Sequence, residues 1–498
     1  MDRIRRVSKV HRIRTGSLEH PRPELSLNEQ PLLWVALLLL ASKALQLVLD
    51  HRPLLFPDSG SFITNALKLE FRPERSYVYS WLIRGLCLPL GSLAPLVVVQ
   101  AVLGGVVASL LAWALIRYLE VRWQIAAAAA FAFAWDPTQV AGEHLVMTEA
   151  AAGFVAALFL ITALEYLRAP SNIWLIASAI LGMFLVGLRL VYLPLVVASA
   201  LIVPLAPPKL WRNRRRMAVA FAVSAAAVLI CQATYQRLIG FLAHREPAYE
   251  YRTGFFLAGN LAPLLEEQDA PDPQTAAVLR DSEHRAYGLS DASSAARNFQ
   301  LWDPNGLVSR LTQAFHGDWL QASSHAEAFA LHAVRRNPLG FLRLAYRSWT
   351  EYRQFLRRDT LPALVRIEDG ADPAVQPSDE RWRIITAHFP QQRRDRATER
   401  TLTRRYHAHA WMWCWMQYLA PFLGLAATCV APARVRLAIG LLTLWSALLI
   451  AVTCLTTPAQ VRYLHPLSFT GLAAVAVLAE RLLRLARFPV TKALDQAT

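Results

Sequence analysis

Ten long apolar stretches, separated by polar segments, limit most strongly what this chain can fold into. A helix needs about 20 predominantly apolar residues to cross the hydrocarbon core of a bilayer. A β-barrel would instead show alternating apolar and polar residues. The sequence therefore predicts an α-helical polytopic membrane protein with about ten transmembrane helices. The expected spans are 31–49, 93–116, 125–140, 146–164, 173–188, 190–205, 218–239, 410–430, 437–455 and 464–479.

The composition supports a membrane protein and gives no sign of a structural metal or disulfide framework. Hydrophobic residues make up 55% of the 498 residues and charged residues only 18%, and the mean hydropathy is +0.28. The five cysteines form no CxxC pair and no Cys/His zinc spacing, so we expect neither disulfides nor a zinc finger.

Basic residues set the expected orientation. The formal net charge is +16, and lysines and arginines cluster between the apolar stretches, which is typical of cytoplasmic loops and not of a nucleic-acid surface. We place the run 212–216 and the tail after residue 479 in the cytoplasm, and expect no nucleic-acid partner. The first stretch is followed by no small-residue cleavage site, so we expect it to be retained as a span.

One region allows two topologies. The apolar residues between 173 and 205 are interrupted at Gly187-Leu188-Arg189. A single long helix would place the basic run 212–216 outside the cell, whereas two short helices broken near Arg189 keep it inside. We therefore expect two helices here, and both chain termini in the cytoplasm.

This topology divides the chain into four parts. Residues 1–30 form a basic cytoplasmic segment, and 31–243 carry spans one to seven, with a first outer loop at 50–92 that we expect to form helices along the membrane surface. Residues 244–409 form a soluble, α-rich domain on the outer face, large enough to hold its own core. Residues 410–498 carry the last three spans and a basic tail.

Within the soluble segment, helical spacing is visible on both sides of Asn337-Pro338. Apolar residues at 326–334 predict one helix that ends at Asn337, and those at 341–352 predict a second helix, which the proline can open. The polar part 268–298 is expected to form a loop or a flap.

Two acidic residues lie beside apolar stretches, where a charge is costly and usually functional. Asp58 lies in Pro57-Asp58-Ser59-Gly60 after the first span, and Glu149 opens the fourth span. Each also has a structural interpretation, because Asp is favoured at a helix N-cap and Glu in a first helical turn. The functional interpretation is a pair of acids facing one outer cavity. The residues alone leave both interpretations open.

Two arginines lie where an anion could bind. Arg189 either caps the hairpin between two helices or grips a phosphate through paired donors. Arg462, followed by Tyr463 at the outer end of the last span, is either a snorkelling arginine beside an interfacial tyrosine or a second phosphate-binding residue. His144, near the fourth span, is either an interface histidine or a ligand.

The order of these elements resembles bacterial glycosyltransferases of the GT-C superfamily, which include protein mannosyltransferases and the aminoarabinose transferases of lipid A. Many relatives have Asp where this chain has Glu149. The resemblance covers nearly the whole chain and rests on the order of several short segments. These are Phe56-Pro57-Asp58-Ser59-Gly60-Ser61-Phe62, Arg75-Ser76-Tyr77-Val78-Tyr79-Ser80, Met147-Thr148-Glu149-Ala150, Leu188-Arg189-Leu190-Val191-Tyr192-Leu193-Pro194, Ala333-Val334-Arg335-Arg336-Asn337-Pro338 and Val461-Arg462-Tyr463-Leu464-His465-Pro466.

The resemblance implies an inverting enzyme of the bacterial inner membrane. It would move a sugar from a polyprenyl-phosphate donor to a lipid, glycan or protein acceptor on the outer face. Asp58 would be the general base, and Glu149 would orient the acceptor or, together with Asp58, bind a divalent metal such as Mg or Mn; the metal stays open. The donor phosphate would meet Arg189, Arg462, Arg75 and Arg84, and the acceptor would meet Tyr77, Tyr79, His144 and Tyr463.

Two other function classes remain as alternatives. An O-antigen-type polymerase or ligase would also use arginines of outer loops on lipid-linked glycans, but it would not need Asp58 as a base. A secondary transporter would fit the interrupted stretch between 173 and 205, although the sequence shows no internal repeat and carries a large outer domain. The sugar, the acceptor, the polyprenol length and the oligomeric state are left open.

Overall fold

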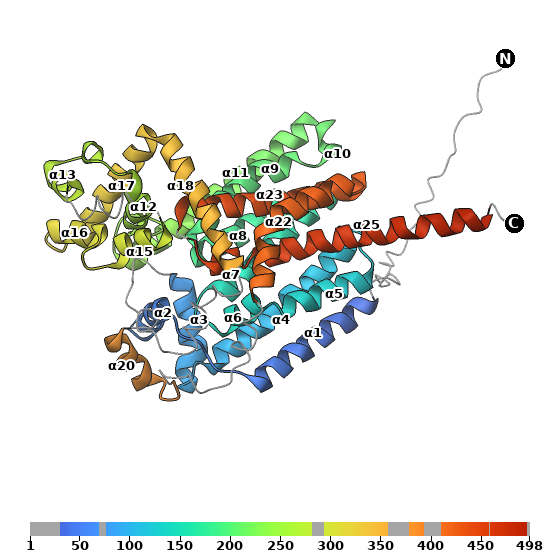
Figure 1. Cartoon of the computed structure of the whole chain (residues 1–498), viewed down its shortest axis with the longest axis horizontal. Coiled ribbons are helices and arrows are strands. Elements are labelled where there is room, and N and C mark those ends of the chain that lie inside the picture. Colours follow the sequence, from blue (N-terminus) through green and yellow to red (C-terminus); the bar gives the residue numbers. More distant parts are fainter. Residues whose placement is uncertain are drawn as a thin grey trace, which may run out of the picture.

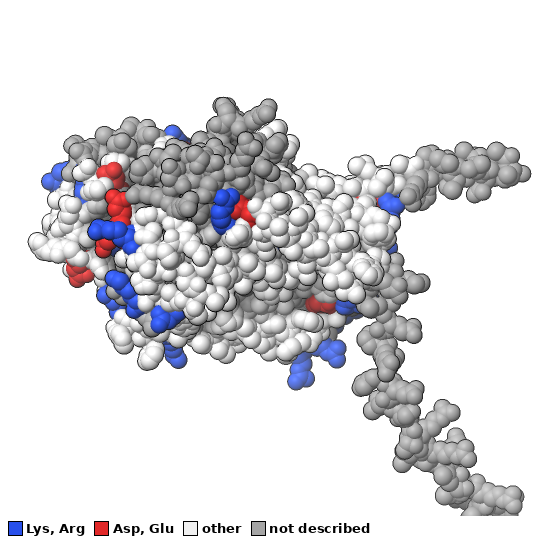
Figure 2. Space-filling model, turned by 90° about the horizontal axis from the view of Figure 1, so that it is seen from below, with Lys and Arg blue, Asp and Glu red and all other residues white. Residues whose placement is uncertain are grey.

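The computed structural model of the chain is helical in the parts that it describes. These are residues 30–68, 76–280, 293–356, 378–392, 410–457 and 459–495. The long apolar helices lie side by side, and most of the described helices between residues 244 and 409 gather at one end of the bundle (Figure 1). On the face drawn in Figure 2, charged side chains concentrate toward that end, beside a broad uncharged surface.

Each predicted span overlaps a helix. The helices are α1 (Gln30–Leu49), α4 (Ala94–Arg117), α5 (Trp123–Ala134), α7 (Glu149–Arg168), α8 (Asn172–Leu188), α9 (Leu193–Ile202), α11 (Arg214–Ala243), α22 (Ala410–Val430), α23 (Ala433–Thr456) and α25 (Leu467–Asp495). Short 3₁₀ turns flank α9 at η2 (Leu190–Tyr192) and η3 (Val203–Leu205), and α10 (Pro208–Trp211) follows.

The helices identify a multi-pass membrane protein. Within the described part of the chain, α1, α4, α7, α11 and α23 are each long and apolar enough to cross a membrane, and α5, α8 and the stretch 190–205 are shorter apolar elements. The prediction of a helical membrane protein is therefore confirmed. The break predicted near Arg189 is also present, because α8 ends at Leu188 and η2 begins at Leu190.

One predicted span is interrupted. The stretch 125–140 was expected to be one helix, but α5 ends at Ala134 and a separate helix, α6 (Pro137–His144), follows. The break arises because the Asp136 side chain accepts a hydrogen bond from the backbone N–H of Thr138 at 2.8 Å and so caps α6. Pro137 at the first helical position reinforces the new start.

The first loop folds into two helices that lie against the bundle. They are α2 (Pro57–Lys68) and α3 (Tyr77–Cys87), followed by η1 (Leu88–Leu90). Ahead of α2, the backbone of Leu54 pairs with the segment after α6 through an isolated parallel bridge to Leu145. This pairing holds the start of α2 beside the start of α7.

The segment 244–409 contains its own buried cluster, which runs from Phe255 to Leu344. Its helices are α12 (Thr253–Leu261), η4 (Ala262–Leu264), η5 (Glu267–Asp269), α13 (Pro273–Arg280), α15 (Ser294–Trp302), α16 (Leu307–Ala314), α17 (Trp319–Arg336), α18 (Pro338–Glu351), η6 (Tyr352–Leu356) and α20 (Asp379–His388). The prediction of a loop at 268–298 is wrong for the parts that α13 and α15 occupy, and residues 281–292 lie outside the described residues.

The helix boundary at Asn337 is confirmed. Helix α17 ends at Arg336, and the Asn337 side chain accepts a hydrogen bond from the Gly340 N–H at 2.8 Å, which caps α18. Beyond α18, Tyr352, Ile385 and Phe389 join the core of the apolar helices instead of the Phe255–Leu344 cluster. The described residues of segment 244–409 therefore contribute to two separate buried cores.

Candidate functional site

Four segments far apart in the sequence bring charged side chains to one place. Glu149 is the first residue of α7, and Arg189 directly follows α8. Arg462 lies in the short helix α24 (Val461–Leu464), and Asp58 is the second residue of α2. Asp58 therefore lies inside the first turn of its helix and not at the N-cap position.

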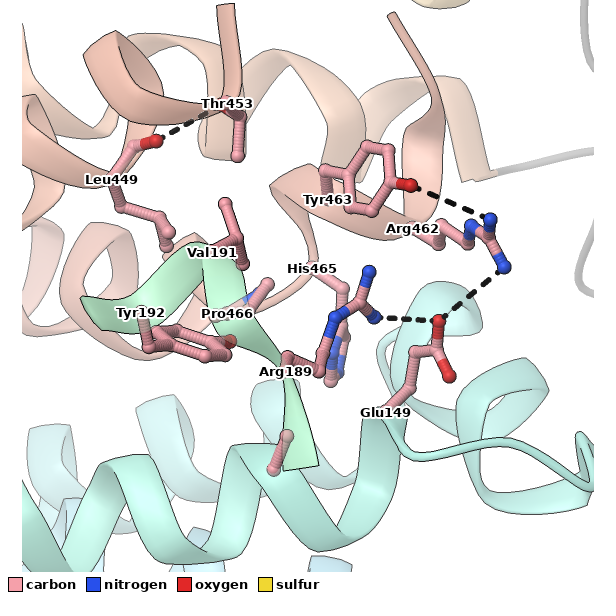
Figure 3. A pocket seen from close by; sticks show the side chains of 11 residues that line it. Glu149, Arg189, Val191, Tyr192, Leu449, Thr453, Arg462, Tyr463, His465 and Pro466 are labelled. Carbon is pink, nitrogen blue, oxygen red and sulfur yellow. Dashed lines mark hydrogen bonds and ion pairs between the residues drawn. The ribbon is translucent and has the colours of Figure 1, made fainter. Parts of the chain in front are cut away.

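Glu149 is the centre of the cluster. Its Oε1 accepts a hydrogen bond from Arg189 Nη1 at 2.7 Å and lies 3.9 Å from Arg462 Nη1. The Glu149 side chain is 3% exposed, and its second oxygen, Oε2, has no hydrogen-bond partner among the described residues. Figure 3 shows both guanidinium groups directed at this carboxylate. A buried carboxylate of this kind is stabilised by its cations and is costly without them.

Arg462 connects the two acids. Its Nη1 donates to Asp58 Oδ2 at 3.2 Å, and both side chains are 18% exposed. Its guanidinium also lies over the rings of Phe56 and Tyr463, at 5.0 and 5.2 Å from the ring centres. Arg189 lies over the same Tyr463 ring at 4.9 Å. These cation–π contacts fix the arginine side chains in addition to the ion pairs.

Three residues of the cluster, Glu149, Arg189 and Arg462, line a cavity. The cavity lies between the start of α7, the turn after α8, α23, and the segment that joins α24 to α25 (Figure 3). Its lining residues are Glu149, Ala152, Arg189, Val191, Tyr192, Leu449, Thr453, Arg462, Tyr463, His465 and Pro466. The site thus places two cations beside an apolar surface.

The other predicted site residues lie elsewhere. Arg84 donates to the backbone oxygens of Ala66 and Leu67 at 2.7 and 3.3 Å, so it caps the end of α2. Tyr77 is buried with its ring edge-on to Trp81. Arg75 lies outside the described residues. The roles of these three residues in binding stay predictions.

Two further predicted residues are fully buried near the cavity but do not line it. The Tyr79 hydroxyl donates to Gln100 Oε1 at 2.7 Å. The two ring nitrogens of His144 face the backbone oxygens of Val140 and Asp50 at 2.8 and 3.1 Å. Both side chains therefore have structural partners, and contact with an acceptor stays a prediction.

The possible metal site at Asp58 and Glu149 has an arginine between the two carboxylates. Arg462 contacts both acids, at 3.2 and 3.9 Å. In the part of the chain that the structure describes, no group of three or more His, Cys, Asp or Glu is placed to hold a metal ion.

Sequence reasoning missed a set of buried polar residues behind the cavity. Lys43 lies in the middle of α1 and pairs with Glu143 at 2.8 Å, and both side chains are at most 1% exposed. Gln139 and His465 continue this set to the cavity. A lysine inside the first apolar stretch was a visible signal, because a charge in a span needs a partner.

No protein-family model matches the sequence, and neither does any curated protein. Among solved structures, the fold is similar to the crystal structure of ArnT from Cupriavidus metallidurans in the apo state, with 15% identity and a TM-score of 0.33 over 90% of this chain and 77% of that chain. The structure of the same protein bound to undecaprenyl phosphate gives 15% identity and a TM-score of 0.31, over 90% and 78%. Similarity at this level assigns neither activity nor ligand, so the residues of this chain must carry any functional inference.

Proposed function

We propose that the protein is an inverting membrane glycosyltransferase that uses a sugar linked to polyprenyl phosphate. The observation that carries the proposal is one cluster of charged side chains: Glu149, Arg189 and Arg462 line the cavity, and Asp58 is paired with Arg462 beside it. The cavity holds two guanidiniums that can bind a phosphate, and Asp58, a carboxylate that can take a proton, lies next to one of them. Transfer of a sugar from a lipid phosphate needs a base for the acceptor hydroxyl and cations for the leaving phosphate.

The arginines would bind the donor phosphate. Guanidinium groups bind phosphate oxygens through paired N–H donors, and Arg189 and Arg462 both reach the same carboxylate oxygen of Glu149. As the bond to the sugar breaks, the phosphodiester becomes a monoester and gains negative charge. Cations that are already in place stabilise that charge without reorganisation.

Asp58 would be the general base. It would take the proton of an acceptor hydroxyl while that oxygen forms a bond to the anomeric carbon. The bond between the same carbon and the phosphate oxygen breaks, and polyprenyl phosphate leaves. This single displacement inverts the anomeric centre. Base catalysis of this kind contributes about 10²–10⁴-fold in rate.

The topology that fits this role has ten spans with both termini in the cytoplasm. It places α2, α3 and the soluble helices on the outer face of a bacterial inner membrane. The basic residues at the start of α11, Arg214 to Arg216, would then lie in the cytoplasm. The soluble helices would cover the cavity and bind the acceptor, whose class stays open between lipid, glycan and protein.

The test compares cells that carry the native protein, a deletion, and Asp58→Asn expressed at the native level. Mass spectrometry of envelope glycans and lipid-linked sugars is the measurement. We expect both mutants to lose one sugar from the same acceptor while its polyprenyl-phosphate donor accumulates. Asp303→Asn is the matched control, since Asp303 only caps a turn in the soluble segment, accepting from the Asn305 N–H at 2.9 Å.

Two results would contradict the proposal. If Asp58→Asn behaves like the native protein while the deletion has a phenotype, Asp58 is a structural residue. That result would favour a secondary transporter over a transferase. If the accumulated donor carries a diphosphate, the polymerase alternative gains. Equal protein levels in the membrane fraction exclude a folding defect as the cause of any loss.

A further inference from the structure

A chain of buried polar side chains runs from the cavity into the apolar helices. It begins at His465, whose ring lines the cavity and whose Nε2 contacts Gln139 Oε1. Gln139 Nε2 donates to Glu143 Oε1 at 2.7 Å, and Glu143 Oε2 accepts from Lys43 Nζ at 2.8 Å. The four residues are between 0% and 4% exposed.

Each link fixes the direction of the next hydrogen bond. Lys43 Nζ donates to three acceptors, Glu143 Oε2, the backbone oxygen of Ala134 at 2.6 Å and Gln46 Oε1 at 2.9 Å, which uses all three hydrogens of an ammonium group. A carboxylate only accepts hydrogen bonds, and therefore Gln139 must present its NH₂ group to Glu143. The amide oxygen of Gln139 then faces His465. Because that oxygen also only accepts, His465 Nε2 must carry the hydrogen.

The second ring nitrogen of His465 is therefore a bare acceptor. A neutral imidazole has one N–H and one lone pair, so a hydrogen on Nε2 leaves Nδ1 without one. In the described part of the chain, Nδ1 is buried and has no hydrogen-bond partner. An unpaired polar atom of this kind is costly to bury, and the ring lies in the wall of a cavity where a ligand can supply the partner.

We propose that His465 Nδ1 accepts a hydrogen bond from a hydroxyl group of the substrate. Gln139, Glu143 and Lys43 are positioning residues, since they set the tautomer without touching the ligand. The inference rests on the proposed transferase function and names a specificity contact for it. A bare nitrogen cannot donate to phosphate oxygens, so the group recognised is a hydrogen-bond donor, for which a sugar or its acceptor offers hydroxyl groups.

The backbone beside the chain leaves room for it. Gly104 of α4 faces Glu143 and Gln139, and a Cβ at this position would overlap the Glu143 carboxylate and lie 2.7 Å from Gln139 Nε2. A side chain here would displace both groups. The absence of a side chain at residue 104 thus keeps the hydrogen-bond chain intact between α4 and α6.

Two substitutions at His465 test the roles of the two ring nitrogens separately. In His465→Gln the amide reaches the place of Nε2 and can still donate to Gln139, but the Nδ1 acceptor is lost. In His465→Asn the amide oxygen can take the place of Nδ1. We expect His465→Gln to lower transfer in cells by about 10-fold or more, and His465→Asn to retain more of it. Binding of undecaprenyl phosphate to the purified full-length protein should be unchanged in both.

Nitrogen-15 NMR of the histidine-labelled full-length protein in nanodiscs reads the tautomer directly. The His465 signals are identified by their loss in His465→Gln. Near neutral pH we expect a protonated Nε2 and a bare Nδ1, and Gln139→Leu should introduce the opposite tautomer. A protonated Nδ1 in the native protein would overturn the inference, as would native transfer by His465→Gln.

The outcomes separate this inference from the proposed function. If the native protein does not bind undecaprenyl phosphate, the transferase proposal fails whatever the tautomer. If it binds and transfers normally with His465→Gln, only the role of His465 fails. The amount of lipid-linked sugar that copurifies with His465→Gln identifies the hydroxyl. A reduced amount indicates the donor sugar, and an unchanged amount with reduced transfer indicates the acceptor.

Discussion

Replacing Glu149 by Gln removes the anion that two arginines share while it keeps the size of the side chain. Glu149 lies 2.7 Å from Arg189 and 3.9 Å from Arg462, and its side chain is 3% exposed. Removing one partner of a buried ion pair costs about 3–5 kcal/mol. We therefore expect Glu149→Gln to be clearly less stable than the native protein in the absence of ligand.

The same substitution should strengthen phosphate binding. In the native protein a phosphate has to compete with the Glu149 carboxylate for Arg189 and Arg462, whereas in Glu149→Gln it supplies the missing anion. Hydrogen bonds to charged groups are worth about 1.5–3 kcal/mol, which corresponds to about 10–100-fold in affinity. Undecaprenyl phosphate should thus restore much of the lost stability, even though transfer itself falls.

Thermal unfolding of the full-length protein in nanodiscs, at increasing amounts of undecaprenyl phosphate, measures both effects. At saturating lipid, a tenfold tighter complex adds about 1.4 kcal/mol of ligand stabilisation. Glu327→Gln is the matched control, since Glu327 is exposed on α17, and it should behave like the native protein. Equal or weaker binding by Glu149→Gln would refute the placement of the phosphate on Arg189 and Arg462.

Three further changes test other parts of the structure. Arg462→Gln should weaken undecaprenyl phosphate binding about 10–100-fold in the same titration. Gly104→Ala should lower the free energy of unfolding by about 1–3 kcal/mol, measured by denaturant, because the new methyl group overlaps Glu143. Burial would raise the pKa of Asp269, but hydrogen bonds from Arg336 and His332 outweigh it and lower the pKa. Asp269 should therefore stabilise α17 above the unfolded pKa of about 4, and protection of α17 from hydrogen exchange should fall below that pH.

Each of these three predictions can be contradicted by a specific result. Arg343 is exposed on α18, and equal losses of phosphate binding in Arg343→Gln and Arg462→Gln would indicate a general charge effect. Unchanged stability in Gly104→Ala would mean that the Glu143 side chain can move aside. Asp269→Asn should already reduce protection at neutral pH and remove the dependence on acid, so native acid sensitivity in that variant would exclude Asp269 as its source.

Local patterns in the sequence were enough to predict most of the helices. Runs of apolar residues identified the membrane helices, and the polar interruption at Arg189 correctly predicted two helices instead of one. Asn337-Pro338 was correctly predicted to end one helix and begin the next, because helix capping depends on only a few adjacent residues. A short loop was expected from Asp136 onward, but the separate helix α6 that Asp136 caps was not predicted, because a cap can lie within an apolar stretch.

The site could be predicted only in part, because its contacts join distant segments. Asp58 and Arg462 are 404 residues apart and meet at 3.2 Å. The sequence indicated that each residue was unusual, but it did not show that the arginine would lie between Asp58 and Glu149. The tautomer proposed for His465 depends on Lys43, Glu143 and Gln139, and no local pattern connects α1, α6 and the turn between α24 and α25.

The charge balance of the cluster implies an order of binding for the proposed reaction. Without substrate, Asp58 and Glu149 are offset by Arg189 and Arg462, so no charge is left without a partner. A carboxylate paired with a guanidinium is a weaker base than a free one. When the donor phosphate takes Arg462, the ion pair between Arg462 and Asp58 weakens, and Asp58 becomes a stronger base than in the protein without substrate. The acceptor hydroxyl is therefore activated more readily after the donor is in place, because the same arginine, Arg462, contacts Asp58 and would bind the phosphate.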